Sequence, residues 1–366
     1  MNAPDKKLLI LYATAGAGHK KAAEAIEHAA RKSYKDIELV DIVDHLPGLS
    51  ARLYVDGYAF LIKHFPKIWG IIYFLSDSRF FSLLNVHLRR FFNRLMCGNL
   101  IRSLLKTQPD VILSTHFLAS EIASYAKTKL GLRSKLITVV TDFGVHNFWI
   151  APATDIYCCA SDITKNILLK KGVPEDRIRV TGIPLDEKFL RIHDRNELFR
   201  EFGLDPKLFT ALIITGGIGA GPIEEIVELI HKDTQVCVVC GFNKPLFDRI
   251  SRKNYLNVKL FEFVDYVEKL MRVSDIVITK AGGLTVTESL TMQKPMIFFF
   301  LIPGQEQINA QTICREDAGI IARSPREIRQ AVLDLKNNPS KLQSFKDHAR
   351  SLSKPDSVSH IISLIG

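Results

Sequence analysis

Two glycine-rich turns and one histidine are the features of this chain whose residue types and spacing favour chemistry. The first turn, Ala15-Gly16-Ala17-Gly18-His19, follows an apolar strand expected over residues 8–13 and leads into an alanine-rich helix. Such a turn lets the backbone approach an anion, and the helix N-terminus behind it offers unpaired N–H groups. The same helix end disfavours imidazolium, so we expect His19 to be neutral and able to accept a proton.

The second turn repeats this plan in the second half of the chain. A strand over residues 211–214 runs into Thr215-Gly216-Gly217-Ile218-Gly219-Ala220-Gly221, and a helix is expected from Pro222 to Ile230, with proline at its favoured first position. Other buried strands are expected at βα spacing over residues 37–43, 111–114, 136–141, 156–160, 236–240, 276–279 and 295–300.

The repeat predicts an α/β protein of two Rossmann-like domains facing across a cleft, with ligands at the carboxyl ends of the strands. The break between the domains is expected near Thr181-Gly182-Ile183-Pro184. We therefore expect an N-terminal domain over residues 1–184 and a C-terminal domain over residues 185–345. A helix within residues 346–366 is expected to pack back on the first domain.

Composition excludes several protein classes. The chain has 366 residues, of which 47% are hydrophobic, and no apolar run is long enough for a transmembrane helix. No signal-peptide pattern is present, and most of the six cysteines lie in apolar runs, so we expect a reducing cytoplasm and core cysteines. The C-x-x-C spacing of Cys237 and Cys240 is a weak indication of a metal or redox site.

A dinucleotide-binding enzyme is the first alternative for the N-terminal turn. Asp41, at the end of the next strand, would then bind the ribose. The third glycine of the G-x-G-x-x-G pattern is Lys21 in this chain, which makes the match poor.

Four segments carry a more specific resemblance. They are AGAGHKKAAEAI, VVTDFGVHNFWI, VTGIPLDEKF, and ITKAGGLTVTESL followed by IPGQEQINA. In sequence, order and spacing they resemble the monogalactosyldiacylglycerol synthase and processive diacylglycerol glucosyltransferase family over residues 8–320. More distantly, the C-terminal block is similar to the transferase that adds N-acetylglucosamine to the peptidoglycan lipid precursor. The resemblance implies the glycosyltransferase B-type fold, an inverting mechanism and a UDP-sugar donor.

The resemblance also implies a donor site in the C-terminal domain. The diphosphate would be cradled by Gly216, Gly217, Gly219 and Ala220, and the uracil would be bordered by Phe242, Asn243, Phe263 and Val264. Glu288, after the pair Gly282 and Gly283, would hold the ribose. The sugar and phosphates would be faced by Gln305, Glu306 and Asn309. Singly, Glu288 could be a first-turn acid that complements the helix dipole, and Gln305 and Glu306 an ordinary polar loop.

In such a transferase His19 would be the base that deprotonates the acceptor hydroxyl, although it could instead contact the diphosphate or position the acceptor. Asp142, at the end of a strand, is the competing base, or a helix cap. Gly18, His146 and Trp149 would border the acceptor, with a core role as the alternative for Trp149. No D-x-D pair lies beside the expected sugar site, so no metal and no cofactor is expected.

Residues 51–106 carry most of the charge asymmetry of the chain. They include nine Lys or Arg and two Asp, interleaved with large apolar residues at helical spacing over residues 80–95. This composition suits an anionic membrane surface, with Trp69, Arg89, Arg90 and Arg94 as contacts. The alternative is a core-facing helix with a solvated face. No nucleic-acid motif accompanies the segment, so no nucleic-acid partner is expected.

The sequence therefore predicts a UDP-sugar-dependent hexosyltransferase acting on diacylglycerol or a related glycolipid, cytoplasmic and peripheral on the inner face of the membrane. Another lipid-linked acceptor, or a UDP-sugar epimerase on the same fold, is the enzyme alternative. A membrane- or nucleic-acid-binding protein on a degenerate scaffold is the non-enzymatic one, and the presence of His19, Asp142 and Glu288 argues against it.

Overall fold

The computed structural model describes residues 6–14, 16–78, 89–217 and 219–366, without the side chains of residues 49, 53–55, 58, 59 and 63. The chain forms two compact units. One comprises Met1–Asp186, Ile302–Gln305 and Lys354–Gly366, and the other comprises Glu187–Leu301 and Glu306–Ser353. The first boundary between the units, after Asp186, lies two residues beyond the domain break that was expected after residue 184. The C-terminal segment of unit 1 begins at Lys354, whereas residue 346 was expected.

A six-stranded parallel sheet is the centre of unit 1, with the strand order β2-β1-β3-β4-β5-β6. Its inner strands β1 and β3 are almost entirely apolar, because helices cover both faces of a parallel sheet. The strands are β1 (Lys7–Tyr12), β2 (Asp36–Asp41), β3 (Val111–Ser114), β4 (Lys135–Val139), β5 (Ile156–Cys159) and β6 (Ile178–Val180).

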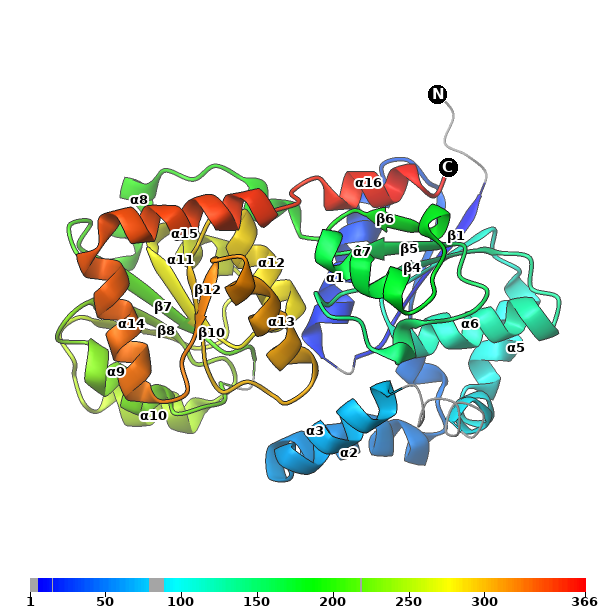
Figure 1. Cartoon of the computed structure of the whole chain (residues 1–366), viewed down its shortest axis with the longest axis horizontal. Helices are drawn as coiled ribbons and strands as arrows, with labels where there is room; N and C mark the ends of the chain where they lie inside the picture. The colour runs from blue at the N-terminus through cyan, green and yellow to red at the C-terminus, as the bar shows by residue number, and fades with distance from the viewer. Residues whose placement is uncertain (1–5, 15, 79–88, 218) are drawn as a thin grey trace. The chain divides into compact units, whose positions relative to one another are not determined.

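The helices of unit 1 include the chain's C-terminal helix (Figure 1). Ile361 and Ile365 of the C-terminal segment are fully buried in the same core cluster as Ile26 and Ala30 of the first helix. The α-helices are α1 (Ala17–Ala30), α2 (Gly48–His64), α3 (Pro66–Asp77), α5 (Gly98–Thr107), α6 (Phe117–Lys129), α7 (Asp162–Lys170) and α16 (Ser357–Ser363). The short 3₁₀ helices are η1 (Ile42–His45), η2 (Asn147–Trp149) and η3 (Glu175–Arg177). Residues 89–96 are also helical.

Unit 2 has a second six-stranded parallel sheet, ordered β12-β11-β10-β7-β8-β9. Its strands are β7 (Thr210–Ile214), β8 (Gln235–Val239), β9 (Val258–Phe261), β10 (Ile276–Thr279), β11 (Met296–Phe298) and β12 (Gly319–Ile321). Its helices are η4 (Glu187–Leu190), α8 (Arg195–Phe202), α9 (Ile223–Ile230), α10 (Lys244–Ser251), α11 (Val267–Val273), α12 (Gly283–Thr291), α13 (Gln305–Arg315), α14 (Pro325–Asn337) and α15 (Pro339–Leu352). In this order the sheet is doubly wound, and the direction of winding reverses between β7 and β10.

The predicted fold class, two doubly wound α/β units, is confirmed. In unit 1 the winding reverses between β1 and β3, and each glycine-rich turn directly follows a strand at a reversal point, β1 in unit 1 and β7 in unit 2. In open α/β sheets ligands bind at this point, outside the carboxyl ends of the strands. The topology therefore places both turns where the sequence pattern required them.

Candidate functional site

His19 is the third residue of α1, immediately after the turn that ends β1. Its Nδ1 lies 2.8 Å from the backbone oxygen of Thr115 and 2.9 Å from the hydroxyl oxygen of Thr141. Thr115 directly follows β3, and Thr141 lies two residues beyond β4, so two neighbouring parallel strands bring these groups to the ring. Burial lowers the pKa of His19 to about 4, against a smaller raising effect of the bond to Thr115. The imidazole is therefore neutral at pH 7, although part of the residue stays exposed.

A second histidine and a tryptophan flank this ring. His116 precedes α6, and its ring packs edge-on against His19 at a centroid distance of 4.7 Å. Burial lowers the pKa of His116 well below its usual value, and the nearby His19 adds to that effect. Trp149 is buried in a core cluster with its ring centroid 6.2 Å from that of His19, so it both packs in the core and lies next to the histidine.

Asp142 and His146 lie in the segment between β4 and η2. Asp142 is buried, and the N-cap of η2 is His146. The Nδ1 of His146 accepts from the backbone N–H of Phe148. Its Nε2 lies 3.0 Å from the backbone oxygen of Tyr73 and 3.2 Å from the hydroxyl of Ser76, both in α3. His146 therefore joins α3 to this loop, and burial lowers its pKa to about 4 despite the opposing effect of Asp77.

The Asp41 carboxylate already accepts hydrogen bonds that the ribose of a bound dinucleotide would have to displace. Its carboxylate accepts from the backbone N–H groups of Thr14 and Val43, at 3.2 and 3.0 Å, and from the hydroxyl of Thr14. The acid thus holds the end of β2 to the turn after β1. A ribose would compete with these three donors, which disfavours a nicotinamide site there.

The glycine-rich turn of unit 2 interlocks with the loop after β8. Gly219 has a φ of +57°, and a Cβ built on it would lie 2.3 Å from the backbone oxygen of Cys240. The side chain of Asn243 donates to the Gly219 oxygen at 2.9 Å, and the N–H of Phe242 donates to the Gly217 oxygen at 2.8 Å. Gly219 is therefore required for loop packing as well as for its backbone conformation. By contrast, a Cβ on Gly216 would have no atom of residues 6–14, 16–78, 89–217 or 219–366 within 4 Å.

Phe242 and Phe263 form an exposed aromatic stack beside this turn. Their ring centroids are 4.6 Å apart with an angle of 9° between the ring planes, and Phe242 is 74% exposed. A ring carbon of Phe242 would also lie 3.4 Å from a Cβ on Gly217. Val264, next to Phe263, is half-buried. Two residues expected to border the uracil thus come together as a flat apolar surface next to the expected diphosphate turn.

The loop after β10 brings together a second group of the predicted donor residues. Gly282 caps α12 and Gly283 begins it, while Glu288 is the sixth residue of that helix and only 5% exposed. Glu288 therefore lies in the second turn, and its alternative interpretation as a first-turn acid is wrong. Asn309 is fully buried and donates to the Ala281 oxygen at 3.0 Å, so it holds the loop before α12.

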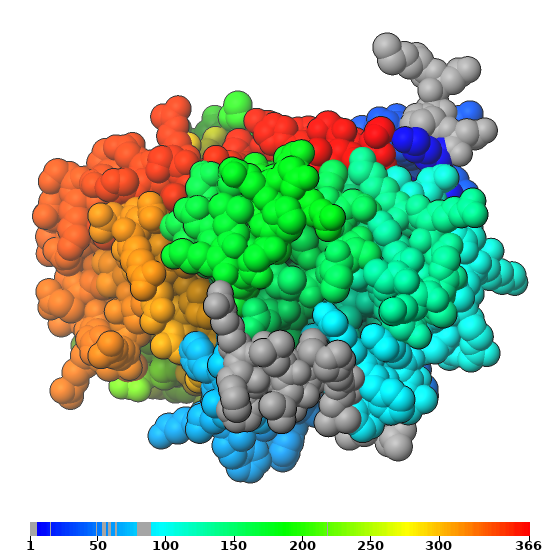
Figure 2. Space-filling view, turned by 45° about the vertical axis from the view of Figure 1, so that its right-hand side comes forward, coloured from blue at the N-terminus to red at the C-terminus, as the bar shows by residue number. Residues whose placement is uncertain are grey.

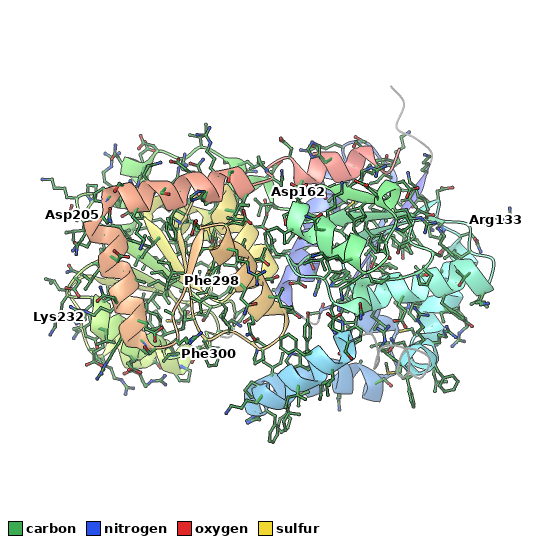
Figure 3. All side chains as sticks on the ribbon, in the orientation of Figure 1. Arg133, Asp162, Asp205, Lys232, Phe298 and Phe300 are labelled. Atoms are coloured by element: carbon green, nitrogen blue, oxygen red, sulfur yellow. The ribbon has the colours of Figure 1, made fainter. Side chains whose placement is uncertain are left out.

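Charged residues complete this part of unit 2. The Nζ of Lys280, directly after β10, lies 3.5 Å from Oε1 of Glu306, and both side chains are largely buried. Gln305 begins α13 but belongs with Ile302–Gly304 to unit 1. Between β11 and that segment the chain passes from the fully buried Phe298 to the exposed Phe300, whose φ is +49° (Figure 3). A positive φ is strained for a bulky residue, and such strain concentrates at functional sites.

The basic segment has a more mixed character than its composition indicated. Arg89 pairs with the buried Glu121 at 2.9 Å and stacks on Phe148, while Arg94 lies 4.0 Å from the ring centroid of Tyr125. Arg90 is half-buried. Trp69 is also half-buried, with its ring 6.0 Å from that of Tyr73. The helix expected over residues 80–95 falls partly on residues 79–88, which lie outside the described residues.

One face of α3 is exposed and apolar. Ile68, Ile71, Ile72 and Leu75 recur at i, i+3, i+4 and i+7 and are between 44% and 60% exposed. The opposite face, with Gly70 and Tyr73, is buried. The side chains of α2 and α3 reach the surface of the unit, in blue, in the space-filling view (Figure 2). Across the described ranges, no helix is long and apolar enough to cross a membrane.

Cys237 and Cys240 are both buried, and burial raises their pKa values to about 12 and about 11. The C-x-x-C spacing therefore belongs to the core of unit 2, where a thiolate is disfavoured. No group of three or more side chains able to hold a metal occurs within residues 6–14, 16–78, 89–217 and 219–366.

Four residues of these sites were missed from the sequence: Thr115, His116, Thr141 and Lys280. All four lie within two residues of a strand's carboxyl end, which is the edge where doubly wound sheets bind ligands. Position after a strand was thus the signal that could have found them.

Comparison with known proteins places these features in one family. Residues 19–185 match the model of monogalactosyldiacylglycerol (MGDG) synthase, and residues 212–361 match that of the glycosyltransferase family 28 C-terminal domain. A probable monogalactosyldiacylglycerol synthase of Glycine max is 31% identical over 378 residues, which cover 98% of this chain and 70% of the relative.

Solved structures share the fold over nearly the whole chain. MurG of Acinetobacter baumannii superposes with a TM-score of 0.65 at 16% identity, covering 99% of each chain. The UDP-GlcNAc 2-epimerase of Neisseria meningitidis, bound to UDP-GlcNAc, superposes with a TM-score of 0.62 at 16% identity, covering 98% of this chain and 99% of the epimerase. The glycosyltransferase B-type fold is confirmed, and at these identities the likeness concerns the fold alone.

Proposed function

Because the chain belongs to the monogalactosyldiacylglycerol synthase family of UDP-sugar-dependent glycosyltransferases, we propose that it transfers a hexose to diacylglycerol or a related glycolipid at a membrane surface. The family name of the relatives makes galactose the first sugar to test. The observation that carries the chemistry is His19, a neutral, half-buried imidazole in the first turn of α1, held at the carboxyl ends of neighbouring strands.

In the proposed reaction the acceptor hydroxyl gives its proton to His19 while its oxygen attacks the anomeric carbon of the sugar. The bond from that carbon to the diphosphate oxygen breaks, and its electron pair leaves with UDP. A direct displacement of this kind inverts the anomeric carbon. A positioned base contributes on the order of 10² to 10⁴ in rate. Asp142, buried near the end of β4, is the alternative base.

Unit 2 would bind the donor. The backbone of the turn around Gly216 and Gly217 would approach the diphosphate, and the Phe242–Phe263 stack offers an apolar surface for a planar base. Glu288, buried in α12, would accept hydrogen bonds from the ribose hydroxyls. In this proposal backbone N–H groups and the N-terminus of α12 stabilise the departing diphosphate, so the reaction needs no cation.

The exposed apolar face of α3 supports docking on a membrane. A diacylglycerol hydroxyl lies at the headgroup boundary, so an enzyme acting on it must reach that depth. Ile68, Ile71, Ile72 and Leu75 would enter the boundary, while exposed cations of the same region, such as Lys67 and Arg102, would face anionic headgroups. Each such cation contributes on the order of 1 kcal/mol near an anionic surface.

The test of the chemistry uses labelled UDP-galactose, UDP-glucose and UDP-N-acetylglucosamine with diacylglycerol in mixed vesicles. We expect one donor to give a glycolipid whose anomeric configuration is opposite to that of the donor. His19→Gln should lower kcat by about 10²- to 10⁴-fold with UDP affinity within about twofold. A mild His19→Gln defect beside a severe one for Asp142→Asn would transfer the base role to Asp142. Absence of sugar transfer from all three donors would refute the proposal.

The docking proposal is tested with a matched pair of double variants. Ile71→Ser with Leu75→Ser removes part of the exposed face of α3, whereas Ile192→Ser with Leu256→Ser removes two apolar side chains of unit 2 that are even more exposed. Losing two membrane-buried side chains should weaken vesicle binding by at least roughly tenfold. The control pair should bind vesicles as the parent does, and both pairs should keep parental UDP affinity. Equal vesicle binding by the two pairs would exclude α3 as the docking surface.

Arg89 is a poor probe of docking, because its loss would leave Glu121 buried without its counter-ion. Replacing Arg90 and Arg94 by Gln, with Arg89 retained, tests the predicted arginine contacts. Vesicle binding through these side chains should increase with the fraction of anionic lipid and weaken as salt is added. If this variant binds vesicles as the parent does at every salt concentration, the two arginines do not contact lipid.

A further inference from the structure

Thr141 lies beside His19 with its hydroxyl oxygen 2.9 Å from Nδ1 of the ring. We infer that Thr141 is a positioning residue which, with the backbone oxygen of Thr115, keeps the proton of the neutral imidazole on Nδ1 and so makes Nε2 the nitrogen that receives the acceptor's proton. The inference rests on the proposed role of His19 as the base. It adds which ring nitrogen acts and what determines that choice.

The backbone oxygen of Thr115 settles the tautomer. A carbonyl oxygen can only accept, so its 2.8 Å contact with Nδ1 is a hydrogen bond only when Nδ1 carries the proton. If Nδ1 were unprotonated, its lone pair would face the carbonyl lone pairs at that distance. In a neutral imidazole with the proton on Nδ1, Nε2 has the free lone pair. Within the described residues, Nε2 of His19 makes no hydrogen bond.

The Thr115 carbonyl is itself rigidly placed. Thr115 is fully buried, and its N–H donates to the oxygen of Leu11 in β1 at 3.0 Å. Its hydroxyl donates to the backbone oxygen of His19 at 2.9 Å. Thr115 therefore holds His19 twice, at the main chain and at the ring. Rotation of the ring about its bond to Cβ would break the ring contact.

Thr141 adds a second acceptor from another strand. With Nδ1–H as the donor, the Thr141 hydroxyl accepts a share of the same proton, so the ring is fixed between the ends of β3 and β4. When Nε2 takes a proton the ring becomes cationic, and bonds from a charged N–H are about twice as strong as those from a neutral one. Both acceptors then stabilise the charge that develops during transfer. The titratable groups nearby are His116, which packs edge-on against the ring, and Asp142, next to Thr141 in the chain.

Valine at position 141 keeps the shape of threonine and removes the hydroxyl, while serine keeps the hydroxyl. We expect Thr141→Val to lower kcat by about 10- to 100-fold, as misplacement of a catalytic group does, with KM for the UDP-sugar within about twofold. Thr141→Ser should recover kcat to within about threefold of the parent. A merely structural role would not separate kcat from KM or respond to the hydroxyl in this way. UDP affinity and the thermal midpoint serve as controls for folding.

The tautomer is read directly by two-bond ¹⁵N–¹H spectra of histidine-labelled protein, with the His19 signals identified by their loss in His19→Gln. We expect a protonated Nδ1 and an unprotonated Nε2 in the parent at pH 7. We also expect the pKa of His19 to be lower in Thr141→Val than in the parent, because the imidazolium loses an acceptor. A proton on Nε2 in the parent, or parental kcat in Thr141→Val, would overturn the inference. Parental kcat in His19→Gln would instead refute the proposed base, while the tautomer spectrum would still report on the contacts of the ring.

Discussion

The two glycines of the second turn allow packing and ligand binding to be separated by experiment. Gly216 and Gly219 both have positive φ, +73° and +57°, so an alanine at either is strained by roughly 1–2 kcal/mol. At Gly219 the new Cβ would also meet the Cys240 oxygen at 2.3 Å and the Cβ of Asn243 at 2.9 Å. Neither the backbone oxygen nor a Cβ can move without shifting the loop, and overpacking of this kind adds roughly 1–3 kcal/mol.

We therefore expect Gly219→Ala to lower the free energy of unfolding of unit 2 by roughly 2–5 kcal/mol, and Gly216→Ala by only about 1–2 kcal/mol. For UDP binding we expect the opposite order, with the larger loss in Gly216→Ala. No atom of the described residues lies within 4 Å of a Cβ on Gly216, so this Cβ would point into the space that the proposal gives to the diphosphate. Gly216→Ala should therefore weaken UDP binding by at least about tenfold while the protein stays folded, because loss of a close backbone approach forfeits charge-assisted bonds.

The assay pairs urea denaturation, followed by a signal from unit 2, with calorimetric titration of UDP into each variant at a temperature where both are folded. Gly131→Ala in unit 1, at another glycine with positive φ (+79°) and no described atom within 4 Å of an added Cβ, serves as the matched control for backbone strain. Parental UDP affinity in Gly216→Ala would refute the placement of the diphosphate. Equal destabilisation by the two glycine variants would refute the argument from close packing at Gly219.

Three further outcomes are expected. Lys294 is half-buried, its Nζ donates to the Ser274 backbone oxygen at 2.6 Å, and desolvation lowers its pKa to about 7. The unfolded chain then binds a proton that the folded protein lacks from about pH 7 to the usual value of 10.5, so stability increases with pH in that window. The free energy of unfolding of Lys294→Met relative to that of the parent should thus fall by about 1.4 kcal/mol per pH unit between pH 7.5 and 9.5 in denaturation experiments. A difference that does not change with pH would show that Lys294 is charged in the folded state. Glu288→Ala should weaken UDP binding by more than twofold in calorimetry, with Glu225→Ala, on the first turn of α9, as a control for loss of a carboxylate. Sugar transfer should persist in excess EDTA; complete loss that magnesium or manganese restores would show that a cation assists the leaving diphosphate.

The alternating elements could be predicted from sequence because buried parallel strands are uninterrupted apolar runs. The strands over 111–114 and 276–279 were predicted to the residue. By contrast, β6, β9 and β12 were missed. They are three or four residues long, and Arg179 and Lys259 interrupt two of them, so their apolar signal is too short to stand out. The helix 346–366 was expected as one piece, but Ser353 ends α15 before Lys354 starts the segment that returns to unit 1.

The sequence by itself determined the two βα repeats, the glycine turns and the family motifs, because each of these depends on residues adjacent in the chain. Only the tertiary structure decided which distant groups surround them. It placed Thr115 and Thr141 on His19 from the ends of separate strands and added burial as a cause that lowers the pKa of the imidazole. It tied Arg89 to Glu121 and left the apolar face of α3 exposed. These facts depend on how strands are ordered in a sheet and which helix faces are covered, and neither is encoded in the local spacing of residues.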